Sequence, residues 1–275
     1  RLLQGVGAAS LGSLNMTLIG DLFPPPQRSA AMGYNGSVLS VGTATYPALG
    51  GALTMLGWSY PFLLALVAVP VGLVALVWLD EPRAGRRPTL REYLRDVGRG
   101  VARREVLGVF LVSVCAFILL YGSYLTYLPF LLEQRFASPP WMIGIVFSSA
   151  SVVTAFCSWN LGRLTRWVPE RTLIAAAFVL YSLALLAVPF GSSVVTVPLP
   201  VLAYGAANGI CMPAASTLLA GLAPLENRAA FMSLNGTVLR LGQTLGPLAM
   251  GAVCTRWGVD ATFHAGAGLA VVSLV

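Results

Sequence analysis

The sequence is poor in charge and in the side chains that carry most enzyme chemistry. Only 10% of its 275 residues are charged; it has no lysine and a single histidine. Soluble domains carry about a quarter charged residues, so the composition argues against a soluble fold. A membrane-embedded enzyme would need a nucleophile with its base, or a cluster of metal ligands. With one histidine and no carboxylate deep in an apolar segment, we expect no enzymatic activity, metal or cofactor.

The few cysteines show neither a disulfide framework nor a metal site. Each of the four lies by itself in an apolar segment, at Cys115, Cys157, Cys211 and Cys254. No two of them have the spacing of a disulfide-rich domain or of a zinc motif. We interpret them as small packing residues.

Long uncharged segments dominate the rest of the chain. Hydrophobic residues make up 57% of it, and the mean hydropathy is +0.79. As helices rising about 1.5 Å per residue, segments of about 20 apolar residues cross the ~30 Å hydrocarbon core of a bilayer. The two longest uncharged runs contain turn-forming residues near their middle, so each predicts a pair of spans. We predict an all-α integral membrane protein with about nine transmembrane helices, at residues 2–21, 30–55, 60–79, 106–132, 141–162, 172–190, 197–221, 229–253 and 260–275.

All 17 basic residues are arginines, and their distribution predicts the topology. If the spans alternate in direction, two arginines fall on one face, Arg135 and Arg256. Thirteen fall on the other: Arg28, the eight from Arg83 to Arg104, Arg163, Arg166, Arg171 and Arg228. The positive-inside rule assigns this second face to the cytoplasm. The net charge of +7 therefore reflects orientation in a bilayer, and we expect no nucleic-acid partner.

An internal repeat divides the chain at an offset of 200 residues. Residues 28–52 and 228–252 are identical at 11 of 25 positions, among them Arg28 and Arg228. From a position in the first copy to the equivalent position in the second, the chain is predicted to cross the bilayer six times. Both copies therefore have the same orientation, as in transporters built from two parallel halves. We predict the last three helices of an N-terminal half at 1–79, and a C-terminal six-helix half at 106–275. The linker at 80–105 is predicted to be an amphipathic helix on the cytoplasmic surface.

Three motifs carry a resemblance to a known family. Arg1, Gln4, Gly5 and Gly7 form the first. Gly42, Pro47, Gly50 and Gly51 form the second, in which Tyr46 stands where the pattern has a glycine. Gly162, Arg163, Arg166 and Arg171 form the third. These resemble the fourth-helix, antiporter and cytoplasmic-loop motifs of the major facilitator superfamily, specifically its twelve-helix drug:proton antiporters.

The resemblance implies a fold, a function and a location. It implies a fragment that covers family helices four to twelve of a monomeric, multi-pass protein in the cytoplasmic membrane of a bacterium. The implied activity is efflux of small amphipathic compounds or drugs, driven by the proton gradient rather than by a cofactor. The proton-carrying carboxylate is then expected in helices one to three of the family fold.

Polar side chains within the spans are the candidates for transport chemistry, because charged groups are costly inside a membrane. Arg1 and Arg240 are candidates for proton or charge relay, and we expect Arg240 to face the central cavity. On the spans that match the cavity-lining helices of the family, the candidates are Asn15, Tyr121, Tyr124, Tyr127, Asn208 and Met212. Hydrogen bonding between packed helices is the alternative role for these side chains.

The sequence leaves other functions open. An uptake or sugar-type carrier can have the same fold, since fold does not determine substrate. A truncated remnant without transport activity is the other alternative.

Overall fold

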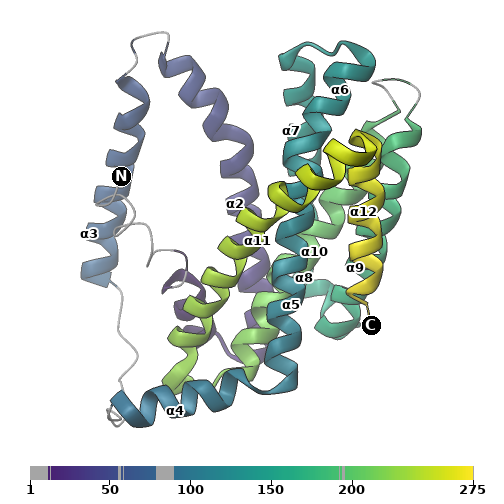
Figure 1. The fold of residues 1–275 in the computed structure, drawn as a ribbon. Coiled ribbons are helices and arrows are strands. Elements are labelled where there is room, and N and C mark those ends of the chain that lie inside the picture. Colours follow the sequence, from purple (N-terminus) through teal and green to yellow (C-terminus); the bar gives the residue numbers. More distant parts are fainter. Residues whose placement is uncertain are drawn as a thin grey trace.

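The computed structural model describes residues 12, 14–54, 57, 59–78, 90–191, 193 and 196–274, and every regular element in these ranges is a helix (Figure 1). The first part of the chain contains residues 14–22, which are helical, and the elements α2 (Pro25–Thr54), η1 (Tyr60–Val67), α3 (Ala68–Trp78), α4 (Leu90–Val101), α5 (Arg104–Ile118), η2 (Leu119–Tyr127) and α6 (Leu128–Phe136). The remainder contains α7 (Pro140–Trp159), α8 (Leu161–Leu164), α9 (Glu170–Ala187), η3 (Val188–Phe190), α10 (Pro198–Leu222), η4 (Leu225–Asn227), α11 (Arg228–Trp257) and α12 (Val259–Val272).

The helices follow the predicted spans closely. From residue 25 onward, each predicted span coincides with a helix or with a continuous run of helices. In the described part of the chain, three helices are long and apolar enough to cross a bilayer: Arg104–Phe136, Trp141–Trp159 and Glu170–Phe190. Helices α2, α10 and α11 are 30, 25 and 30 residues long, but serine, asparagine, threonine and glycine lower their mean hydropathy.

Most of the second half, residues 106–275, forms one bundle. Helix α10 packs against α9 and α7, α11 against α5 and η2, and α12 against α9. The largest fully buried side chains in the bundle include Tyr181, Phe178 and Phe263. Helix α4, which belongs to the segment predicted as a linker, lies across one end of the bundle (Figure 1). We call this the inner end; α2, α5, α9 and α11 all begin there.

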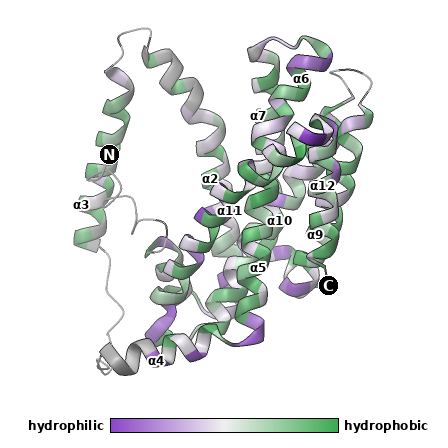
Figure 2. Ribbon diagram, viewed as in Figure 1, coloured by the Kyte–Doolittle hydropathy of each residue, from purple (hydrophilic) through white to green (hydrophobic). Residues whose placement is uncertain are grey.

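The segment from η1 to α3 stands apart from this bundle (Figure 1). Its side chains are almost entirely apolar and many are exposed, with Phe62 at 70% and Leu76 at 84% (Figure 2). Apolar side chains are stable on a helix surface when lipid or another helix covers them.

A π-helix interrupts the span that the sequence predicts as a regular helix at 106–132. In η2, the Thr126 hydroxyl donates to the Tyr121 carbonyl, five residues earlier, at 2.6 Å. Pro129 follows this stretch and has no N–H to donate to the preceding turn. Stretches of π-helix are frequent at functional sites.

Candidate functional site

Arg228, the first residue of α11, joins the two halves at the inner end. Its side chain is 5% exposed and forms an ion pair with the carboxylate of Asp21, which lies in the last turn of the first half's helix at 14–22. It also donates to the Gly20 carbonyl at 2.6 Å and to the Ala220 carbonyl at 3.1 Å. Gly20 and Asp21 belong to the first half and Ala220 to the second, so one guanidinium connects them.

Arg28, the repeat partner of Arg228, is buried at the same place. Burial and repulsion from Arg228 lower the pKa of the Arg28 guanidinium, whereas attraction to Asp21 raises it. The Arg28 Nε atom is buried and has no hydrogen-bond partner among the described residues. Two buried arginines therefore lie near Asp21, which forms its ion pair with Arg228. We call Asp21, Arg28 and Arg228 the inner latch.

Close backbone contacts extend the latch along α2. A Cβ on Gly33 would lie 2.2 Å from the Ser158 carbonyl oxygen, and one on Gly162 would lie 2.4 Å from the Ala30 Cβ. The Ser37 hydroxyl donates to the Ala155 carbonyl at 2.6 Å. Beyond this point Ser40 is still buried, but most described side chains of α2 are exposed, with Val38 at 69%. The halves thus pack together at the inner end, and α2 and α7 diverge toward the other end (Figure 1).

Helices α7 and α10 pack through small residues at a spacing of four. A Cβ on Gly205 would lie 2.5 Å from the Ala150 carbonyl oxygen, and one on Gly209 would lie 2.4 Å from that of Thr154. The Thr154 hydroxyl donates to the Gly205 carbonyl at 2.8 Å, and the Ser158 hydroxyl donates to the Gly209 carbonyl at 2.8 Å. Small residues at this spacing let helices in a membrane approach closely.

A tyrosine cluster lies where η2, α9 and α10 meet. The rings of Tyr124 and Tyr204 are stacked, with centroids 4.3 Å apart. The Tyr181 hydroxyl donates to the Asn208 Oδ1 atom at 3.0 Å. The hydroxyls of Tyr124 and Tyr204 are buried and have no hydrogen-bond partner among the described residues. The structure thus places the predicted Tyr124 and Asn208 in one region and adds Tyr181 and Tyr204.

The other predicted cavity residues are dispersed. Tyr121 is half-buried beside Phe117, and Met212 is half-buried against the core. Asn15 belongs to the first half, where its amide donates to the Asn35 Oδ1 atom at 2.6 Å. Tyr127 is half-buried, and its hydroxyl lies beside Gly251.

We expect Tyr181→Phe to affect the orientation of Asn208 more than the packing of the bundle. The substitution keeps the buried ring and removes one hydrogen bond. Such a bond between membrane helices contributes about 0.6 kcal/mol to stability. The midpoint of thermal unfolding in detergent should therefore change little. The rate of transport should fall severalfold if the Asn208 amide contacts substrate; an unchanged rate would assign the pair to helix packing.

Arg240 is exposed on α11. Its Nη1 atom donates to the Gln243 Oε1 atom at 2.7 Å. Among the described residues it forms no ion pair. Its predicted role in charge relay stays a prediction.

The antiporter motif packs differently in the two copies of the repeat. In α2, the ring of Tyr46 lies over Gly42, 3.3 Å from a Cβ placed there. In α11, a Cβ on Gly246 would lie 2.9 Å from the backbone nitrogen of Gly122 in η2. Thus the second copy brings helices together, and in the first a side chain covers the same face. Helix α2 continues through the remaining motif residues: Pro47, Gly50 and Gly51.

The loop motif lies at the inner end. Arg163 donates to the Asn160 Oδ1 atom at 2.9 Å, and Arg171 forms an ion pair with Glu105 at 2.6 Å. Arg166 is exposed. The fourth-helix motif, which comprises Arg1, Gln4, Gly5 and Gly7, lies outside the described residues.

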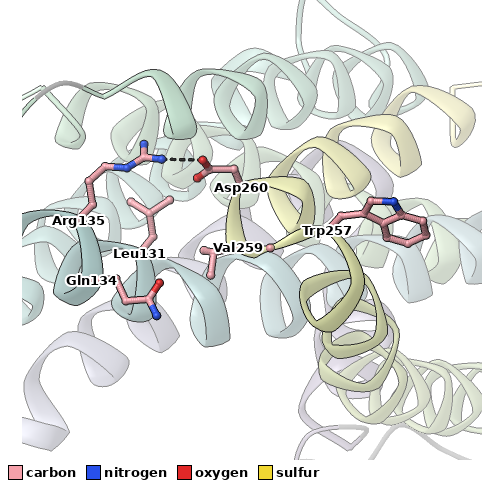
Figure 3. Close-up of a pocket in the computed structure, with 7 residues that line it drawn as sticks. Leu131, Gln134, Arg135, Trp257, Val259 and Asp260 are labelled. Carbon is pink, nitrogen blue, oxygen red and sulfur yellow. Dashed lines mark hydrogen bonds and ion pairs between the residues drawn. The ribbon is translucent and has the colours of Figure 1, made fainter.

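A pocket of about 340 Å³ opens at the opposite, outer end of the second half (Figure 3). It lies between the end of α6 and the corner that joins α11 to α12. Arg135 forms an ion pair with Asp260 at 2.6 Å and also donates to the Pro189 carbonyl. One guanidinium therefore ties α6 to η3 and α12. Within the described residues, no three histidine, cysteine, aspartate or glutamate side chains form a metal site.

We expect Arg135→Ala to loosen this corner without unfolding the protein. The ion pair is partly exposed, at 34% and 46% for its two side chains, so its loss should destabilise the bundle by about 1 kcal/mol. Thermal unfolding in detergent would show a shift of a few degrees. Arg256→Ala is the matched control, since Arg256 is exposed and contacts the Trp257 ring at 5.5 Å; an equal shift in both variants would contradict the prediction.

Sequence reasoning missed the pairing of Asp21 with Arg228. A signal was present, because both copies of the repeat keep the arginine and only the first has an aspartate seven residues before it; the second has Gly221. Because the repeat has two arginines but one aspartate at these positions, the pattern indicates that Asp21 can serve either arginine as a counter-ion. The partner of each arginine nevertheless depends on how the helices pack.

Comparison with known proteins places the chain in a family. The model of the Major Facilitator Superfamily matches residues 1–204 and 169–275. Multidrug resistance protein 2 of Bacillus subtilis is 24% identical over 263 residues, which cover 92% of this chain and 64% of that protein. Drug efflux pump JefA of Mycobacterium tuberculosis is 42% identical over 81 residues, which cover 29% of this chain and 15% of that protein.

A solved structure agrees with these matches. That of the human organic anion transporter MFSD10 (TETRAN) superimposes with a TM-score of 0.83 at 25% identity. The match covers 95% of this chain and 66% of that one, so the chain spans slightly less than two thirds of these full-length relatives. The predicted all-α membrane fold and the family resemblance are confirmed, and the chain belongs to the major facilitator superfamily of membrane transporters.

Proposed function

We propose that the protein is a proton-coupled exporter of small amphipathic compounds in the cytoplasmic membrane of a bacterium. The observation that carries the proposal is the inner latch, which joins two repeat-related halves at the inner end. Proteins built in this way expose a central site alternately to each side by rocking one half against the other. The relatives named as a multidrug resistance protein and a drug efflux pump support export and this substrate class.

The latch has the geometry of an inner gate. If the arginine-rich end faces the cytoplasm, this structure is closed to the cytoplasm and open outward. Release of substrate and binding of a proton from outside then favour breaking the latch, because a ligand shifts a conformational equilibrium toward the state it binds better. Arg1 and Arg240 are the proposed charge-relay residues. We propose that the transporter acts as a monomer with the bilayer and the substrate as its partners.

Everted membrane vesicles test this function directly. Respiration acidifies their interior, so an exporter should accumulate a fluorescent amphipathic dye inside the vesicles, and a protonophore should abolish the accumulation. Addition of substrate should also dissipate the pH gradient, measured with a pH-sensitive dye. Accumulation that persists in the protonophore would contradict proton coupling, and movement in the opposite direction would favour an uptake carrier.

A further inference from the structure

The exposed surface of α11 is divided into two rows of different chemistry. A polar row contains Ser233, Thr237, Arg240 and Thr244, spaced four, three and four residues apart, and all are exposed. An apolar row beside it contains Leu234, Leu241, Leu245 and Leu248, which are 37% to 66% exposed. Residues three or four apart lie on one face of a helix. The leucine row is suited to lipid, and the polar row is not.

Arg240 lies too deep for its charge to reach the membrane surface easily. It follows Arg228, at the inner end of α11, by 12 residues and precedes Trp257, at the outer end, by 17. At about 1.5 Å per residue these distances are about 18 Å and about 26 Å. A guanidinium at such a depth is costly against lipid and is found facing a bundle interior or a water-filled cavity.

Apart from Gln243, no described residue accepts a hydrogen bond from the N–H groups of the Arg240 guanidinium. The hydroxyls of Thr237 and Thr244 donate to backbone carbonyls of their own helix, those of Ser233 and Arg240. Gln243 accepts one hydrogen bond from Arg240 and carries no charge. A guanidinium has five N–H donors in a planar fork, which matches a carboxylate or another planar oxyanion with two parallel hydrogen bonds.

We propose that Arg240 is the recognition residue for an anionic group on the transported compound, and that the substrates are amphipathic anions such as aromatic carboxylates. This inference rests on the proposed transport function and names its substrate class. The serine and threonine hydroxyls of the row provide a hydrophilic surface for the polar part of the substrate. The matched solved structure is likewise that of an organic anion transporter.

Binding to the full-length protein in detergent tests the inference separately from transport. The probes are a fluorescent aromatic carboxylate and its neutral methyl amide, which have nearly the same shape. Loss of a hydrogen-bonded charge pair corresponds to about tenfold or more in affinity. We therefore expect Arg240→Gln to weaken binding of the carboxylate by about tenfold or more and to leave the amide unchanged. Arg240→Lys, which keeps the charge but loses the fork, should recover part of the affinity.

Arg256→Gln is the matched control, since it removes an exposed arginine at the outer end of the same helix and should not alter binding of either probe. Equal binding of both probes by the unmodified protein would overturn the inference. So would an equal loss of both in Arg240→Gln together with a lower midpoint of thermal unfolding, because Arg240 would then be a structural ion-pair partner. Selective binding of the carboxylate without proton-driven accumulation in vesicles would sustain the inference and reject the proposed export.

Discussion

Replacing Asp21 with asparagine is expected to open the inner end of the transporter and to reduce transport by at least tenfold. The substitution removes the carboxylate that pairs with Arg228 and leaves two buried arginines that repel each other, Arg28 and Arg228. Removal of one partner from a buried ion pair destabilises the arrangement by about 3–5 kcal/mol. Both arginines become accessible to water when the halves separate, so the loss should appear as opening rather than as unfolding.

Distance measurements can follow this opening. Spin labels on Gln27 and Arg166, which are exposed at the inner end of the first and second half, should move apart in Asp21→Asn. The native cysteines are replaced by alanine in the background. A swap of the charges, Asp21→Arg with Arg228→Asp, should not restore the closed state, because Arg228 also donates to two backbone carbonyls.

Glu105→Gln is the matched control for the latch. It breaks the ion pair between Arg171 and Glu105 at the same end, where the two side chains are 63% and 53% exposed. Pairs this exposed contribute about 0–1 kcal/mol, so both label distance and transport should stay near those of the unmodified protein. If the two variants behave alike, the latch does not control the inner end.

Replacing Gly209 with valine is expected to prevent stable packing of α7 against α10. Even the Cβ atom of the new valine would lie 2.4 Å from the Thr154 carbonyl oxygen and 3.0 Å from the Cys157 Cβ. The backbone oxygen cannot rotate away, so the helices must separate. Overpacking costs about 1–3 kcal/mol or more, and separation also breaks the hydrogen bonds of Thr154 and Ser158 to α10. We expect low yields and a much lower midpoint of thermal unfolding.

Gly144→Val provides the control, since Gly144 lies in α7 and has no atom within 4 Å of a Cβ placed on it. Both substitutions introduce the same β-branched side chain into a helix, so their difference isolates the packing of α7 on α10. Similar unfolding midpoints for the two variants would show that the contact at Gly209 can relax.

The sequence predicted the helices well because hydropathy is a local property. The spans from residue 25 onward, the linker helix and the family resemblance all follow from apolar runs, arginine placement and short motifs. The π-helix η2 was not predicted, because a single inserted residue in a turn hardly alters the pattern of apolar side chains. The domain boundaries and the roles of the motif residues remain predictions.

The candidate site was predicted less completely, because it depends on which side chains meet. Asn208 was identified as a polar residue in a span, but its partner Tyr181 lies 27 residues away in α9. Gly42 and Gly242 are equivalent positions of the repeat, yet in the described part of the chain only Gly242 lies against a neighbouring helix, where a Cβ on it would lie 2.7 Å from the Val114 carbonyl oxygen. Equivalent sequence positions acquire different neighbours once the halves are packed.

By itself, the sequence determined that this chain is a helical membrane protein and that it contains an internal repeat, because burial in lipid selects composition segment by segment. Tertiary structure decided which charged groups meet at the inner end. Asp21 and Arg228 are separated by 207 residues along the chain, and both copies of the repeat present an arginine at that place. Only the docking of one half on the other brings Asp21 against Arg228, since an ion pair forms through proximity in space rather than through order in sequence.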